Sequence, residues 1–207
     1  HRHNPRLIVD GPAVNVRPGG SNPPPDFGSL SVRLLSSLDF GGACFVTVNT
    51  SCRREHLLRA GGFDTDFSGT YGWEDTELGF RLLAMGLRRV KNRAAVVLHC
   101  PPADSTADSL AAKRRECGRN AILYYRKHPV PSVRRQIRLD GRSRAGYLDR
   151  LCRGLRAEIR DGEWHAVRPF TGLAARCFLR REYILGLEEG IAAYGLPAAD
   201  AEEGRDQ

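Results

Sequence analysis

The chain has 207 residues, of which 41% are hydrophobic and 27% charged, and its formal net charge is +8. This composition is typical of a folded globular protein and excludes an intrinsically disordered chain. The longest apolar runs, such as residues 94–98, are far shorter than the about 20 residues that cross a membrane as a helix.

The positive charge comes almost entirely from arginine, because the lysines are only Lys91, Lys113 and Lys127. Arginine binds phosphate and carboxylate groups through paired hydrogen bonds, which favours an anionic partner. A GC-rich coding bias would give the same excess, and both interpretations stay open. No basic run is interleaved with aromatic residues, so the sequence argues against nucleic acid as a partner.

The cysteines show no C-x-x-C spacing, which argues against a zinc knuckle. Several fall on predicted apolar faces, where a free cysteine acts as a small apolar residue, so a reducing compartment is favoured, although the even number leaves disulfides open. No apolar leader opens the chain. We therefore expect a cytoplasmic protein, with peripheral membrane contact as an option. The cysteines are Cys44, Cys52, Cys100, Cys117, Cys152 and Cys177.

Two short strands are predicted near the N-terminus. Residues 6–11 (RLIVDG) are mostly apolar and read as a buried strand. A loop rich in proline, glycine and serine follows, centred on residues 17–29. Residues 44–49 (CFVTVN) are β-branched and apolar and predict the second strand.

A short helix is predicted next, over residues 52–60. The triplet Asn49-Thr50-Ser51 matches a glycosylation acceptor, but its position before this helix favours capping by Thr50 and Ser51. Gly61 and Gly62 are expected to end the helix.

A longer helix is predicted to begin near Glu74 and to end at Gly86. Glu77 and Arg81 form an i, i+4 pair on the face opposite the apolar residues. Residues 93–100 (RAAVVLHC) then predict a strand that ends at His99. The apolar residues of the helix recur at helical spacing: Leu78, Leu82, Leu83 and Met85.

Beyond residue 103 the pattern is helical. Residues 109–128 predict a helix that Pro129 and Pro131 interrupt. Two amphipathic stripes follow, and arginines flank the first of them, where they could meet anionic lipid or simply face water. The first half therefore reads as α/β and the second as all helix. The stripes consist of Leu148, Leu151, Cys152, Leu155 and Ile159, and of Leu173, Cys177, Ile184, Leu187, Ile191 and Tyr194.

The adjacent carboxylates Glu74 and Asp75 have two interpretations. Acidic residues in a first helical turn gain about 0.3–1 kcal/mol from the helix dipole, which alone would account for them. The preceding loop, residues 61–73, combines four glycines with four aromatic residues. Glycines let a ligand approach the backbone and exposed aromatic rings pack on sugars, so a carboxylate at this place could also act as a general base.

Residues 61–64 (GGFD), residues 71–82 (YGWEDTELGFRL) and the strand ending in His99 together resemble the C-terminal catalytic half of family 2 glycosyltransferases of the GT-A fold. The resemblance extends to the galactosyltransferase C-terminal module and to chondroitin-polymerase-type enzymes. It implies an α/β fold in which residues 1–128 are the acceptor-side half of a GT-A (Rossmann-like) domain. Residues 129–207 would be an all-helical C-terminal extension.

The resemblance also implies roles for particular residues. Asp75 would be the general base that takes the proton from the acceptor hydroxyl in an inverting reaction, and Glu74 would hydrogen-bond a substrate sugar. The substrate-binding residues would be Tyr71, Gly72, Trp73, Asp64 and Phe67. His99 would complete a Mn²⁺ or Mg²⁺ site that holds the diphosphate, although a histidine at a strand end is often purely structural.

One part of the family pattern is missing. The resemblance implies a nucleotide-binding half that ends in an Asp-x-Asp motif and supplies the other metal ligand, and it should precede residue 1. The D-x-D triplet at residues 64–66 belongs instead to the acceptor-side loop. We therefore expect an incomplete chain: a truncated one, one completed by self-association or a partner chain, or a degenerate protein.

These considerations predict a metal-dependent hexosyltransferase of family 2 type, acting in polysaccharide biosynthesis. It would transfer a sugar from a nucleotide-sugar donor to a glycan or lipid-linked acceptor. The alternative is a non-catalytic carbohydrate-binding or scaffold protein that retains the acceptor surface.

Overall fold

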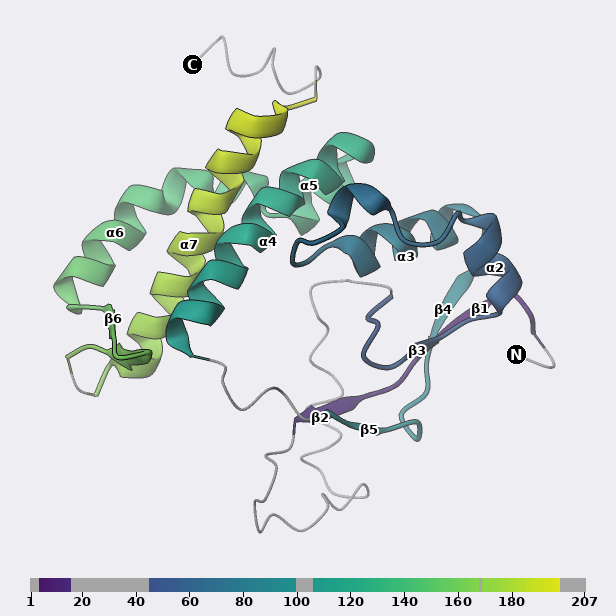
Figure 1. Cartoon of the computed structure of the whole chain (residues 1–207), viewed down its shortest axis with the longest axis horizontal. Helices are drawn as coiled ribbons and strands as arrows, with labels where there is room; N and C mark the ends of the chain where they lie inside the picture. The colour runs from purple at the N-terminus through teal and green to yellow at the C-terminus, as the bar shows by residue number, and fades with distance from the viewer. Residues whose placement is uncertain (1–3, 16–44, 100–105, 168, 198–207) are drawn as a thin grey trace. The chain divides into compact units, whose positions relative to one another are not determined.

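The computed structural model describes residues 4–15, 45–99, 106–167 and 169–197 (Figure 1). Its contacts separate two compact units. The first, here called the sheet unit, comprises residues 1–68 and 74–104, and the second, the helical unit, comprises residues 69–73 and 105–207. The expected domain boundary at residue 128 does not coincide with this division, and a division by function stays a prediction.

The sheet unit contains two small sheets. Strand β1 (Leu7–Asp10) pairs in parallel with β4 (Arg88–Lys91) and antiparallel with β3 (Thr50–Ser51), so the strand order is β3-β1-β4. Strand β2 (Ala13–Asn15) pairs in parallel with β5 (Val97–His99). The buried strand predicted over residues 6–11 is thus confirmed, and Ile8 is fully buried.

The core of the sheet unit lies between the sheet and helix α3 (Glu74–Ala84). The helical spacing predicted from Leu78 and Leu82 is confirmed, because both side chains are fully buried. Leu83 is 40% exposed and does not belong to this core. The helix ends before Gly86, whose φ of +84° is the left-handed conformation that glycine adopts most easily.

The predicted strand over residues 44–49 is wrong within its described part. Residues 46–49 form a turn, in which the Asn49 N–H donates to the Val46 carbonyl at 3.2 Å. The Thr50 hydroxyl stabilises the turn, since it accepts from the Val46 N–H at 3.1 Å and lies 2.6 Å from the Val46 oxygen. Side-chain hydrogen bonds of this kind compete with strand pairing.

The predicted capping by Thr50 and Ser51 is also wrong, because both residues belong to β3. Helix α2 (Arg54–Arg59) is shorter than expected, and its N-cap residue Arg53 makes no side-chain capping hydrogen bond. Gly61 and Gly62 end the helix as predicted, with amide groups that bond to the carbonyls of Leu58 and Leu57.

The pair Glu77–Arg81 is buried rather than placed on an exposed face. Glu77 is 1% exposed and accepts two hydrogen bonds from Arg81 Nε, at 2.8 and 3.0 Å. Arg81 also donates to the carbonyls of Ala60 and Gly62, the latter at 2.7 Å. The pair therefore ties α3 to the turn that ends α2.

The C-terminal strands of the sheet unit differ from the prediction. The strand expected over residues 93–100 is reduced to β5, because residues 93–94 form a turn. Strand β4 was not predicted, since its sequence Arg-Arg-Val-Lys contains one apolar residue. Its pairing with β1 in the fold, rather than its own pattern, makes it a strand.

The helical unit is built on the long helices α4 (Ala107–Lys127) and α7 (Thr171–Tyr194), which lie side by side (Figure 1). Helix α5 (Pro131–Gln136), a 3₁₀ segment η2 (Leu139–Arg144) and helix α6 (Ala145–Gly154) connect them. The predicted interruption by prolines is confirmed, because Pro131 occupies the first turn of α5.

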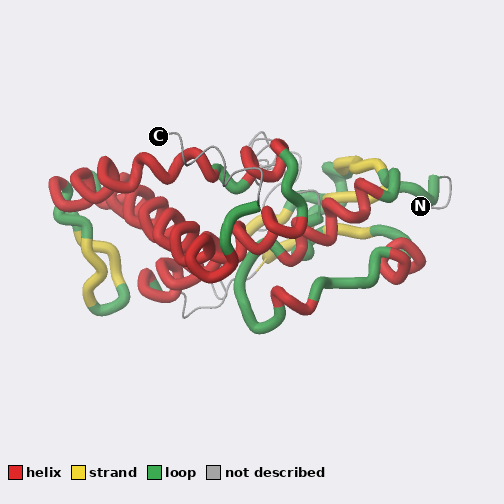
Figure 2. The backbone as a smooth tube through the Cα atoms, turned by 90° about the horizontal axis from the view of Figure 1, so that it is seen from above, coloured by secondary structure: helices red, strands yellow, loops and turns green. Residues whose placement is uncertain are grey.

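The prediction that the second half is all helix is wrong at one place. Strands β6 (Glu158–Arg160) and β7 (Glu163–His165) form an antiparallel hairpin, drawn in yellow at the far left of Figure 2. Ile159 lies in β6, although its spacing from Leu155 fitted a helical stripe. Asp161 and Gly162 form the turn with positive φ angles of 52° and 76°.

Glycines allow α4 and α7 to approach closely. A Cβ atom on Gly118 would lie 2.1 Å from the Tyr183 oxygen, and one on Gly186 would lie 1.8 Å from the Arg115 oxygen. Neither place has room for a side chain.

No helix in the described part of the chain is both long and apolar enough to cross a membrane.

The described cysteines, Cys52, Cys117, Cys152 and Cys177, are not joined in disulfides. Burial raises the pKa of Cys52 and Cys152 above that of an ordinary thiol. Cys44, Cys100 and the loop predicted over residues 17–29 lie outside the described residues.

Candidate functional site

The candidate base Asp75 occupies the first turn of α3 in the sheet unit and is half-buried. Burial raises the pKa of its carboxyl group, because desolvation disfavours the charged form. Hydrogen bonds from the backbone of Thr47 and Thr76 and from the Thr76 hydroxyl, 3.3 Å from Oδ1, act in the opposite direction and only partly offset this effect.

This environment suits proton abstraction. Among the residues that the structure describes, no cation forms an ion pair with Asp75, so its charge is not neutralised by a fixed partner. A carboxylate with a raised pKa holds an abstracted proton more strongly than an ordinary aspartate does. The Thr47 amide comes from the turn that replaces the predicted strand, so this turn helps to orient the carboxylate.

Glu74 is the first residue of α3 and is partly buried. Successive helical residues point about 100° apart, so Glu74 and Asp75 present their carboxylates in different directions. This separation is compatible with different roles for the two residues.

Residues 69–73, the last part of the loop predicted over residues 61–73, belong to the helical unit, where one face of α4 holds this part of the loop. The buried amide of Asn120 donates to Thr70 Oγ1 at 2.8 Å and to the Tyr71 carbonyl at 3.2 Å. Gly72 lies against Cys117, since a Cβ atom at Gly72 would come within 3.0 Å of the cysteine Sγ atom.

Trp73 is fixed most firmly within this loop. Its indole stacks on Tyr124 and its Nε1–H donates to the Cys117 carbonyl at 2.8 Å. Its φ angle is +80°, a backbone conformation that a bulky residue rarely adopts. Strain of this kind persists where surrounding contacts over-determine it and is often found at functional sites. One face of the indole is therefore already covered, and a role as a sugar-binding floor stays a prediction.

Tyr71 is the exposed aromatic residue within residues 69–73, with 51% of its surface accessible. The Lys113 ammonium group lies 5.5 Å from the centroid of its ring, within the range of a cation–π contact. Tyr71 thus offers an apolar face next to a positive charge, an arrangement that suits a polar or anionic ligand.

The other predicted loop residues lie around the 3₁₀ segment η1 (Thr65–Phe67). Asp64 precedes η1, and its Oδ1 atom accepts a hydrogen bond from the Asp66 amide at 3.0 Å. Phe67 is 3% exposed. Both side chains thus have local structural roles, and their predicted contact with substrate stays a prediction.

His99 is the last residue of β5, opposite Asn15 in β2, and it is exposed. Over the described ranges, no group of three or more His, Cys, Asp or Glu side chains could hold a metal ion. The described residues therefore do not by themselves form the expected Mn²⁺ or Mg²⁺ site, and we derive no catalytic step through a metal.

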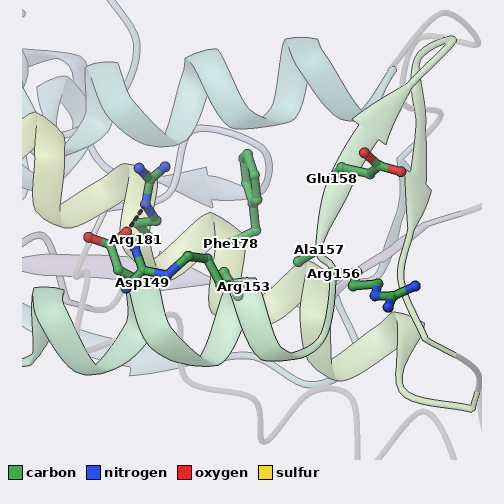
Figure 3. Close-up of a pocket in the computed structure, with 8 residues that line it drawn as sticks. Asp149, Arg153, Arg156, Ala157, Glu158, Phe178 and Arg181 are labelled. Atoms are coloured by element: carbon green, nitrogen blue, oxygen red, sulfur yellow. Dashed lines mark hydrogen bonds and ion pairs between the residues drawn. The ribbon is translucent and has the colours of Figure 1, made fainter.

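A cavity of about 490 Å³ lies in the helical unit between α6, the start of β6 and α7 (Figure 3). The predicted site residues do not line it. Arg181 is ion-paired with Asp149 across it, and Phe178 forms an apolar wall. The cavity is lined by Asp149, Cys152, Arg153, Arg156, Ala157, Glu158, Phe178 and Arg181.

Sequence reasoning missed Asn120, which holds the loop. A signal was present, because asparagine is unfavourable inside helices and Asn120 stands in the middle of the α4 sequence. It also missed the contribution of Thr47, which no local pattern reveals because the contact depends on the turn at residues 46–49.

Part of the chain is similar to two curated proteins. Both are validoxylamine A glucosyltransferases, one from Streptomyces hygroscopicus subsp. jinggangensis (strain 5008) and one from Streptomyces hygroscopicus subsp. limoneus. Each is 34% identical over 95 residues, which is 46% of this chain. The similarity spans 21% and 20% of the length of these relatives, respectively. No family model and no solved structure matches the chain.

Proposed function

We propose that the chain is part of a glycosyltransferase in which Asp75 removes the proton from the acceptor hydroxyl. The observation that carries this proposal is the half-buried Asp75 carboxylate, whose pKa is raised and which no described cation neutralises. A hydroxyl is a poor nucleophile until a base takes its proton. The partial similarity to two glucosyltransferases supports glycosyl transfer as the reaction.

The finer proposal is a family 2 enzyme of the GT-A fold that acts with inversion. The acceptor oxygen attacks the anomeric carbon of a nucleotide sugar, the bond to the nucleoside diphosphate breaks, and Asp75 takes the proton. Tyr71 and the loop that includes it would contact the acceptor, and Glu74 would hydrogen-bond a sugar. His99 would supply one ligand to a divalent metal, with the other ligands from outside the described residues.

The names of the relatives suggest the first substrates to test. A nucleoside diphosphate glucose would be the donor, and validoxylamine A would be the first acceptor probe. A glycan or lipid-linked acceptor is the broader class that we propose for this chain.

The test compares Asp75→Asn with Asp108→Asn in the full-length protein. Asp108 is a matched control, because it also lies in the first turn of a helix, α4, and is exposed. Transfer is measured with UDP-glucose and GDP-glucose as donors and validoxylamine A or a glucan oligosaccharide as acceptor. We expect Asp75→Asn to lower kcat by about 100-fold or more, within the range of general-base catalysis, and Asp108→Asn to have little effect.

Binding of the acceptor is measured separately by calorimetry. Retained acceptor binding with lost turnover in Asp75→Asn would support its role as the base. Unchanged turnover would contradict that role. Acceptor binding without any transfer by the unmodified protein would favour the alternative, a carbohydrate-binding or scaffold protein.

A further inference from the structure

A cluster of five arginines in the helical unit is not used by the proposed reaction. Three of them lie in or beside η2 within seven residues, one lies on α4 and one on α7. Here this group is called the arginine cluster, and its members are Arg114, Arg138, Arg142, Arg144 and Arg180.

The geometry of Arg180 brings the cluster together. Its guanidinium group lies over the Tyr183 ring, with Cζ 5.3 Å from the ring centroid. On the η2 side it lies against the backbone of Gly141, because a Cβ atom there would come within 2.7 Å of Arg180 Nη2. The buried Tyr183 hydroxyl, in turn, donates to the Ile137 carbonyl at 2.8 Å, just before η2 begins. These contacts fix the partly buried Arg180 against the η2 segment, in or beside which three arginines of the cluster lie.

The charge of the cluster is not balanced. Within the described ranges, none of its five members forms an ion pair with a carboxylate. Asp140 lies in the same segment, but its carboxylate is already bound by Arg134 at 2.7 Å. The Nε atom of Arg142 is buried and has no hydrogen-bond partner among the described residues.

The surroundings of Arg180 reflect this excess of positive charge. Burial lowers the pKa of Arg180, the Tyr183 phenol acts in the opposite direction, and the charges of three neighbouring arginines lower the pKa further. The three are Arg138, Arg144 and Arg114. Like charges held together in a partly buried place cost free energy, which a bound anion would offset.

We propose that the arginine cluster binds a phosphate-bearing ligand with more than one negative charge, such as a diphosphate. Guanidinium groups bind phosphate oxygens through paired hydrogen bonds, and the unpartnered Arg142 Nε provides a buried donor. This proposal does not rest on the proposed Asp75 reaction. The same chemistry would be met by a soluble diphosphate or by the phosphomonoester headgroup of a lipid such as phosphatidic acid.

The experiment uses the full chain and two phosphate probes. Sodium pyrophosphate is titrated in a calorimeter at low and high salt, and sedimentation is measured with vesicles of phosphatidylcholine with and without phosphatidic acid, whose phosphomonoester headgroup can carry two negative charges. The variants are Arg180→Gln and Arg142→Gln. The matched control is Arg119→Gln, which removes the same charge from an exposed position of α4.

We expect one of the two probes to bind saturably, with an affinity that falls as the salt concentration rises. Kd should rise about tenfold in Arg180→Gln and in Arg142→Gln, as for the loss of one charge-assisted hydrogen bond, and less than about twofold in Arg119→Gln. Pyrophosphate binding with this pattern identifies a soluble ligand, and vesicle binding with this pattern identifies a lipid-borne phosphate. Circular dichroism shows whether each variant folds. If Arg180→Gln does not fold, the Kd of Arg142→Gln tests the proposal.

Two results would overturn the proposal. One is the absence of saturable binding to both probes. The other is an equal loss in Arg119→Gln, which would show a response to net charge rather than a built site.

Discussion

The indole ring of Trp73 stacks on the phenol ring of Tyr124, with the ring centroids 5.4 Å apart and the planes inclined by 20°. Together with the amide of Asn120, this contact holds residues 69–73 on α4 and keeps Trp73 at a φ of +80°. The backbone strain at Trp73 is thus supported by contacts to a single helix face.

Removal of the Asn120 amide should loosen this loop. Asn120→Ala should lower the free energy of unfolding by about 1–3 kcal/mol, because the Thr70 hydroxyl and the part-buried Tyr71 carbonyl lose the buried amide that donates to them. Urea unfolding measures the change. The adjacent exposed Arg119 gives the control, since Arg119→Ala should change stability by less than about 0.5 kcal/mol. Equal effects of the two substitutions would contradict the role of Asn120.

The raised pKa of Asp75 has a consequence for stability as a function of pH. The folded state holds this proton more tightly than the unfolded state, so stability falls as pH rises through the folded-state pKa. The Asp75→Asn variant has no titratable carboxyl group at this position, so it does not lose stability in this way as pH rises. The free energy of unfolding of the variant, relative to the unmodified protein, should therefore increase between about pH 4, the ordinary pKa of aspartate, and neutral pH.

Urea unfolding at several pH values between about 3.5 and 7 tests this sign, since this interval brackets the ordinary pKa of aspartate. Asp108→Asn, which also removes one carboxylate from the first turn of a helix, is the control for the change in charge. A relative stability of Asp75→Asn that falls as pH rises would mean that the carboxylate is stabilised, rather than destabilised, by its surroundings.

The Glu77–Arg81 pair should contribute to the stability of the sheet unit. Glu77→Ala leaves the Arg81 guanidinium partly buried without its carboxylate and should cost about 3 kcal/mol, the lower end for a broken buried pair, because Arg81 is partly exposed. The control is Glu55→Ala in α2, whose carboxylate is exposed and 3.5 Å from Arg53. Thermal unfolding should show a clear loss for the first variant and almost none for the second.

The close approach of α4 and α7 predicts that substituting Gly186 at their contact destabilises the protein. Gly186→Ala places a methyl group against the Arg115 backbone, which cannot give way as a flexible side chain would, so it should cost at least about 1–3 kcal/mol. Gly172→Ala, in the same helix but with open space around it, should be neutral or stabilising by up to about 1 kcal/mol. A similar melting temperature for both variants would mean that the helices can separate without cost.

The sequence predicted those elements whose pattern is long and regular. Helices α3, α4 and α7 follow from apolar residues at helical spacing, and β1 from a compact apolar run. The hairpin β6–β7 was missed because Ile159 also fitted a helical stripe. The dipeptide Asp161-Gly162, which favours a tight hairpin turn, was the signal that could have identified it.

Other features depend on contacts between distant parts of the chain. β4 has the pattern of an exposed segment and becomes a strand by pairing with β1. The turn at residues 46–49 depends on the Thr50 hydroxyl, which also lies 3.1 Å from Asp10 Oδ1. For the candidate site, the sequence indicated Asp75 and the aromatic loop. It could not show that Tyr124 covers one face of Trp73 or that Phe67 is buried.

The helical unit is discontinuous in sequence, because residues 69–73 belong to it while the segments on either side belong to the sheet unit. A fragment that starts at residue 105 would therefore expose the surface of α4 around Tyr124 on which Trp73 rests. The two units cannot be exchanged between proteins by a single crossover in the gene. Any recombination that preserves both must carry the short segment with its helix, so the units are expected to be inherited together.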